Sequence, residues 1–138
     1  MNDAAVAIRF DDNGRIYQPG ETLSGEYVLE SVPPGAVSTI EVSVLWYSEG
    51  KGDEDLAMHE FWRRSIDEGD YIDPGRAETF RTTLPQSPLS YDGLIVKLRW
   101  CVRVRAFLRS GKELFGQKAF RLGNVPAAKV HAAKVQSA

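Results

Sequence analysis

The chain has 138 residues, of which 43% are hydrophobic and 26% are charged, and its formal net charge at pH 7 is −2. These totals predict one soluble globular domain with a sizeable core, and the slightly negative charge argues against a nucleic-acid binder. No apolar run approaches the roughly 20 residues of a transmembrane span, and a single cysteine rules out an internal disulfide and favours a reducing compartment, so we expect a cytoplasmic protein.

Short strands separated by turn residues are predicted for the first part of the chain. Apolar and polar side chains alternate, and the segments between them are rich in glycine, proline and aspartate. Gly25 inside one of these strands indicates a bulge or a close approach of neighbouring backbone. The predicted strands cover residues 5–10, 16–17, 22–30 and 37–48.

The second part of the chain continues this pattern. The spacing of apolar residues in 56–66 fits a strand or a short helix, and the turn residues at both ends favour the strand. Further strands are expected at 76–84 and 113–122, with a proline-punctuated connection through 85–93. Residues 124–138 are predicted to be a flexible or weakly helical tail, which leaves residues 1–123 as one domain.

The longest predicted strand runs from Leu94 to Leu108, with the sequence LIVKLRWCVRVRAFL. Its even-numbered side chains are apolar and its odd-numbered ones are mostly basic, so one face meets a core and the other meets water or a partner. At helical spacing the same arginines would scatter over every face. Six to eight such strands without a long helix predict an all-β, immunoglobulin-like antiparallel β-sandwich.

Two stretches resemble the N-terminal domain of the arrestins. The sequence YQPGETLSG at 17–25 resembles the entry to the second strand of that domain, and LPQSPLSYDG at 84–93 resembles its connection into the central strand. A strand with an aromatic residue and a V-R-V pattern follows, here Trp100 to Arg105. In the connection, the hydroxyl of Ser90 is expected to bond backbone groups. The resemblance covers roughly residues 5–123 and implies a single-domain sandwich of the arrestin N-domain type.

The resemblance implies a non-catalytic adaptor or scaffold whose loops and edges bind other proteins. Arrestins usually have two such sandwiches and this chain has length for one, so the phosphate sensing that depends on their second domain and tail is not carried over. No nucleophile elbow, phosphate-binding loop or paired-carboxylate motif is present in the sequence. We therefore expect neither an enzyme nor a bound cofactor.

Basic side chains at spacing two form a stripe on one face of the central strand and the turn after it: Lys97, Arg99, Arg103, Arg105 and Arg109. Such a stripe would dock an acidic or phosphorylated protein segment, or an anionic membrane. The alternative is cross-strand pairing with acids such as Glu41 or Glu113. Cys101 lies on the same face, where positive charge would lower the pKa of a reactive thiol, but a lone cysteine inside a strand is usually structural.

Apolar side chains are also predicted on the outward faces of the long strands: Leu45, Tyr47, Ile95 and Phe107. They would be exposed unless another sandwich, a second copy of the chain or the tail covers them. We therefore predict a protein partner or a homo-oligomer on this face. The predicted partner-binding residues are Lys97, Arg99, Arg103, Arg105, Arg109, Leu45, Tyr47 and Phe107.

A different function would follow from the acidic loops, which contain Glu49, Asp53, Glu54 and Asp55, with Asp67, Asp70 and Asp73 nearby. Carboxylates of this kind suit Ca²⁺, so the alternative is a calcium-dependent, anionic-lipid or small-ligand binding sandwich. Their spacing matches no EF-hand, and a solvated loop is the simpler interpretation. His59, His131 and Cys101 form no zinc pattern, so no metal site is predicted.

Overall fold

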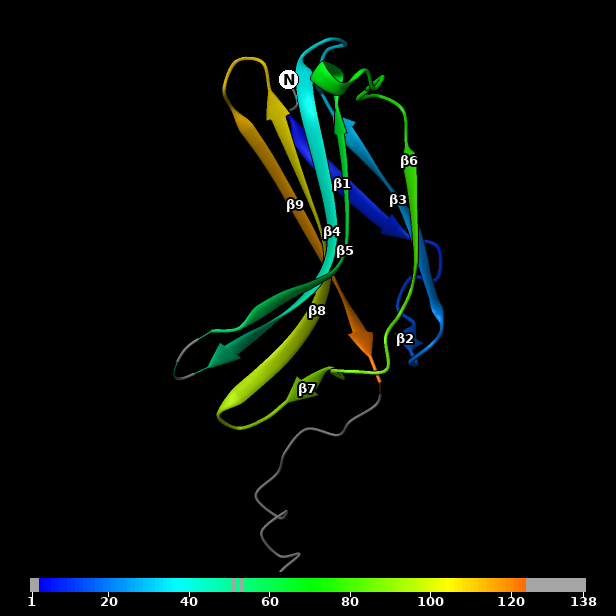
Figure 1. The fold of residues 1–138 in the computed structure, drawn as a ribbon, viewed down its shortest axis with the longest axis vertical. Helices are drawn as coiled ribbons and strands as arrows, with labels where there is room; N and C mark the ends of the chain where they lie inside the picture. Colours follow the sequence, from blue (N-terminus) through cyan, green and yellow to red (C-terminus); the bar gives the residue numbers. More distant parts are fainter. Residues whose placement is uncertain (1–2, 51, 53, 124–138) are drawn as a thin grey trace, which may run out of the picture.

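The computed structural model describes residues 3–50, 52 and 54–123, and it shows two sheets that face each other (Figure 1). The small sheet has the order β1-β3-β6, and the large sheet has the order β2-β9-β8-β4-β5, with β7 paired to β8. A 3₁₀ helix, η1, covers Ile66–Glu68. The strands are β1 (Ala5–Phe10), β2 (Ile16–Tyr17), β3 (Thr22–Glu30), β4 (Val37–Gly50), β5 (Leu56–Ser65), β6 (Glu78–Thr83), β7 (Tyr91–Asp92), β8 (Val96–Leu108) and β9 (Glu113–Leu122). The predicted all-β sandwich is confirmed.

All strand pairs are antiparallel except one. β2 pairs with β9 in parallel, with Ile16 opposite Arg121 and Tyr17 opposite Leu122. The connection before β7 also contacts the end of β9, because the Ser90 hydroxyl accepts a 2.8 Å hydrogen bond from the Leu122 N–H. The Ser90 N–H in turn donates to the Leu122 carbonyl at 2.7 Å. The Ser90 hydroxyl therefore bonds backbone, as expected, but the backbone belongs to β9 and not to the loop, and three segments distant in sequence meet at the end of β9.

The core lies between the two sheets and is filled by the even-numbered side chains of β8. Trp100, Val102, Val104 and Ala106 are almost completely buried, as the alternation predicts. The Trp100 ring lies 5.8 Å from that of Phe120, and its indole Nε1 donates a 2.7 Å hydrogen bond to the Pro88 carbonyl. Trp100 therefore links the large sheet to the connection that precedes β7.

Gly25 of β3 lies where the strands of the small sheet are closest. A Cβ atom at this position would lie 2.2 Å from the Arg9 carbonyl oxygen and 2.8 Å from Cζ of Phe80. Both distances are shorter than a van der Waals contact, so no side chain fits without movement of the backbone. The close backbone approach that the sequence predicts at Gly25 is confirmed.

The start of the central strand differs from the prediction. β8 begins at Val96, and Leu94 and Ile95 form the turn of a hairpin with β7, which the sequence did not reveal. The Gly93 N–H closes this turn on the Val96 carbonyl at 2.9 Å. Leu94 therefore points into solvent instead of the core, and its predicted inward position is wrong. The tail predicted at 124–138 lies outside the described residues.

Candidate functional site

The outward side chains of β5, β4, β8 and β9 form the outer face of the large sheet, and they line up in rows across it. One row contains Phe61, Ser43, Arg103 and Gln117. The neighbouring row contains Met58, Leu45, Cys101 and Ala119. The register therefore places the predicted basic stripe in the middle of the outer face, between the apolar side chains of β5 and those of β9.

Two of the arginines in the stripe are paired within the chain. Arg105 binds both carboxylate oxygens of Glu113, at 2.8 and 3.2 Å, and lies 3.9 Å from Glu41. This hydrogen bonding lowers the pKa of the Glu113 carboxyl. Arg99 donates through its Nε to one carboxylate oxygen of Glu49, and it lies 3.9 Å from Asp92. The alternative of cross-strand pairing is therefore confirmed for these two residues, and Glu41 and Glu113 are the acids that the sequence suggested for it.

Arg103 is held differently. Its Nε donates a 3.0 Å hydrogen bond to the Gln117 side chain, and its guanidinium lies 5.6 Å from the centre of the Phe115 ring. Among residues 3–50, 52 and 54–123, no carboxylate pairs with Arg103, and none pairs with Lys97 or Arg109. Arg109 donates instead to the Gly35 carbonyl at 2.8 Å. The terminal nitrogens of Arg103 thus remain available to an outside acceptor.

Leu45 is not exposed, in contrast to the prediction. It lies on the outer face opposite Cys101, yet the solvent-accessible fraction of both residues is 0%. Neither belongs to the core between the sheets, so the chain's own neighbouring side chains on the outer face cover them. Tyr47 and Phe107 are partly exposed. Leu45 therefore packs beneath the exposed side chains of the outer face, and because it is buried it is not available to contact a partner.

The sequence missed the largest apolar area on the outer face. Leu56, Met58 and Phe61 of β5 are 45–56% exposed, and Phe115 of β9 is 55% exposed. A bulge between Val44 and Leu45 shifts the register, so that both Met58 and Phe61 point outward although their positions differ by three, an odd number. A strict period of two cannot place both residues on one face, and this is why the pattern of 56–66 was ambiguous.

Burial determines the chemistry of Cys101. It raises the pKa of the thiol to about 11, although the nearby Arg103 acts in the opposite direction. The pKa is not lowered, because the loss of hydration outweighs the charge of the partly exposed Arg103, and the structural interpretation of Cys101 holds. Cys101 is a structural residue of the sheet.

This burial gives a testable pH dependence. The unfolded thiol, with a pKa of about 8.5, ionises before the folded one, so the contribution of Cys101 to stability is full below that pH. We expect stability to fall by up to about 3 kcal/mol as the pH rises towards 11, measured by urea unfolding. Cys101→Ala should lack this part of the decrease. Rapid alkylation of the folded thiol by iodoacetamide at pH 8 would contradict the assignment.

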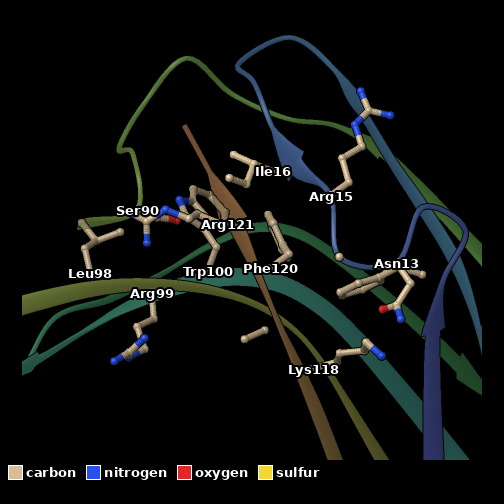
Figure 2. A pocket seen from close by; sticks show the side chains of 13 residues that line it. Asn13, Arg15, Ile16, Ser90, Leu98, Arg99, Trp100, Lys118, Phe120 and Arg121 are labelled. Atoms are coloured by element: carbon tan, nitrogen blue, oxygen red, sulfur yellow. The ribbon is translucent and has the colours of Figure 1, made fainter. Parts of the chain in front are cut away.

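A hollow of about 380 Å³ lies beside the ends of β8 and β9 (Figure 2). Four basic residues contribute to its lining, but Figure 2 shows Arg15 and Arg99 pointing in different directions. Arg15 is paired with Asp12 and Glu21, both at 2.8 Å, and Arg121 is paired with Asp92 at 3.0 Å. Lys118 lies over the ring of Phe10. These cations do not converge on one point, so the hollow is a weaker candidate site than the outer face.

The acidic loops do not assemble a cation site within the part of the chain that the structure describes. No three potential metal ligands gather among those residues. Asp70 accepts a hydrogen bond from the Ser65 N–H and Asp73 accepts one from the Gly75 N–H. Asp53 and His131 lie outside the described residues, and Nε2 of His59 lies 2.7 Å from the Thr83 carbonyl oxygen.

None of the helices in the described residues has the length and apolar character needed to cross a bilayer.

Comparison with known proteins identifies the fold but does not identify a family. No protein-family model matches the chain, and no curated protein matches it in sequence. The structure is similar to the sporulation control protein Spo0M from Bacillus subtilis, with a TM-score of 0.63 and 18% identity, over 91% of this chain and 51% of that one. It is also similar to the superoxide reductase neelaredoxin from Ignicoccus hospitalis, with a TM-score of 0.52 and 10% identity, over 86% and 80% of the two chains. At these identities the similarity shows a β-sandwich fold, and the chain spans about half the length of Spo0M.

Proposed function

We propose that this sandwich is a non-catalytic adaptor or scaffold domain of the arrestin-like type, which binds an acidic or phosphorylated segment of a protein partner on its outer face. The observation that carries the proposal is Arg103, a cation without a carboxylate partner among the described residues, in the middle of the outer face. The YQPGETLSG and LPQSPLSYDG stretches support the arrestin-like assignment. The sporulation control role in the name of Spo0M is compatible with a regulatory domain.

The geometry around Arg103 suits a short extended segment. Within the described residues, Arg103 donates a hydrogen bond only through its Nε, so both terminal nitrogens are left to form the two parallel hydrogen bonds that a carboxylate or phosphate accepts. Met58 and Phe61 on β5, and Phe115 on β9, offer exposed apolar surface on either side. A charged anchor flanked by aromatic and thioether side chains is a frequent composition of protein-binding surfaces.

Replacing Arg103 by alanine tests this proposal. Fluorescence anisotropy with a panel of acidic and phosphorylated peptides should show binding to the unmodified protein, with a preference over neutral peptides of the same length. A charge-assisted hydrogen bond contributes about 1.5–3 kcal/mol, so we expect Arg103→Ala to lose about tenfold or more in affinity.

The matched control is Arg76→Ala. Arg76 is exposed on the connection before β6, and no side-chain ion pair holds it within the described residues. Its removal changes the net charge equally and should leave the affinity unchanged. Equal losses of affinity in the two variants would show that overall charge, and not the position of Arg103, determines binding. An unchanged affinity in Arg103→Ala would refute the site. A concentration-dependent dimer that Phe61→Ser dissociates would instead assign the outer face to a second copy of the chain.

A further inference from the structure

Among the described residues, the most exposed aliphatic side chains lie in the turn between β7 and β8. Leu94 and Ile95 are each 72% exposed, and Val96 is 41% exposed. Figure 1 shows this hairpin projecting from one end of the large sheet, next to the hairpin of β4 and β5. Three consecutive aliphatic side chains at a projecting tip are unusual for a surface that contacts only water.

The tip is well defined in its backbone. The hydrogen bond from Gly93 to Val96 closes the turn, and Tyr91 and Asp92 pair with Leu98 and Lys97 below it. The neighbouring hairpin supports it from the side, since a Cβ atom on Gly50 would lie 2.2 Å from the Ile95 carbonyl oxygen. The aliphatic side chains are therefore presented by a closed hairpin, and inserting them into an apolar medium would require little ordering of the chain.

Two carboxylates close behind the tip are paired with arginines. Asp92 is paired with Arg121 at 3.0 Å, and Glu49 is paired with Arg99. Lys97 follows Val96 directly and is exposed, with no ion pair among the described residues. Tyr91 lies at the base of the same hairpin. A lysine and a tyrosine placed just behind an aliphatic tip match the polarity gradient of a bilayer interface, where a lysine side chain extends to the headgroup phosphates.

We propose that the β7–β8 tip inserts into the interfacial region of a lipid bilayer, with Leu94 and Ile95 among the acyl chains and Lys97 at the phosphate level. A lipid surface fits better than a protein pocket for two reasons. The tip projects outward, and its side chains are all aliphatic, whereas the residues that dominate protein interfaces are mainly Trp, Tyr and Arg. Contacts with hydrocarbon are non-directional, so aliphatic side chains can enter it in any orientation.

The lipid charge should have a small effect. Lys97 attracts anionic headgroups, but Glu54 and Asp55 on the neighbouring hairpin are exposed and repel them. The apolar insertion therefore dominates, and binding should occur on zwitterionic lipid and change little with salt. This sets the tip apart from the outer face, whose proposed ligand is anionic.

Vesicle flotation with the full chain tests the inference. We expect the protein to float with phosphatidylcholine vesicles, and the double variant Leu94→Ser/Ile95→Ser to lose at least tenfold in the partition coefficient. Ile16→Ser is the matched control, since Ile16 is an exposed aliphatic residue on β2. Its flotation should equal that of the unmodified protein. Because the substituted side chains of the tip are exposed, the melting temperature of the double variant should not fall.

Two outcomes would overturn the inference. One is absence of flotation both with phosphatidylcholine alone and with phosphatidylcholine mixed with phosphatidylserine. If the double variant then also fails to bind a protein that the unmodified chain binds, the tip is assigned to a protein partner. The other is equal flotation of the double variant and the unmodified protein. Arg103→Ala should float normally, so failure of the proposed adaptor function and failure of the tip are distinguishable.

Discussion

Gly25→Ala is expected to destabilise the sandwich by about 3 kcal/mol or more, at the upper end of the effects of overpacking. The added methyl group would lie 2.2 Å from the Arg9 carbonyl oxygen, 2.8 Å from Phe80 and 3.1 Å from Cα of Phe10. Two of these three contacts are with backbone of β1, so relief requires β1 and β3 to separate along their shared ladder. Because a domain of this size has a total stability of about 5–15 kcal/mol, the loss is a large part of it.

Urea unfolding followed by circular dichroism measures this change. Gly75→Ala is the matched control, because the nearest atom to its added methyl group is 3.8 Å away, on the Asp73 side chain. Its stability should stay within about 0.5 kcal/mol of the unmodified protein. If Gly25→Ala unfolds at the same urea concentration as Gly75→Ala, the close approach of β1 and β3 is wrong.

Trp100→Ala is expected to cost about 3–5 kcal/mol, the usual range for removal of a buried tryptophan. Trp100 is 1% exposed, and its ring meets Phe120 at 5.8 Å and His59 at 6.2 Å. Its indole N–H is also the donor to the Pro88 carbonyl. The substitution therefore leaves a cavity in the core between the two sheets and a carbonyl without its partner.

Trp100→Phe separates the two losses. It keeps an aromatic ring and removes the donor to Pro88, so about 1–3 kcal/mol of the destabilisation should remain. Tyr71→Ala is the control for removing an aromatic side chain, since Tyr71 is 76% exposed and its loss should change stability by less than about 0.5 kcal/mol. Thermal and urea unfolding of the three variants would provide the comparison. A Trp100→Ala protein as stable as Tyr71→Ala would contradict the placement of Trp100 in the core.

Local pattern was sufficient to predict most of the strands. The predictions for β1, β2, β3 and β9 agree with the structure residue for residue, because turn residues flank each of them. β4 extends two residues beyond its predicted end, and β6 is shorter at both ends. Leu84, just beyond the end of β6, is buried in the core, so the alternation of apolar side chains continues past the last paired residue and does not mark the strand boundary.

The candidate site was less predictable, because it depends on which strands are neighbours. Sequence alternation placed Leu45 and Cys101 on the outer face, but their burial there depends on side chains from β5 and β9. The partners of Arg99 and Arg103 likewise come from other strands, namely Glu49 of β4 and Gln117 of β9. The turn at Leu94 was hidden for another reason. Its apolar residues continue the alternation of β8, and only the pairing of β7 with β8 shows where the strand begins.

The parallel pairing of β2 with β9 has a consequence for the protein as it is being synthesised. β2 and β8 both leave the ribosome before β9, which is the last strand of the sandwich. Until Leu122 has emerged, β2 has no place in the large sheet, and Trp100 lacks the ring of Phe120. One edge of β8, whose even-numbered side chains fill the core of the finished sandwich, is then open to other nascent chains. Chains stalled before residue 122 should therefore be strong chaperone clients, whereas chains released after it should not.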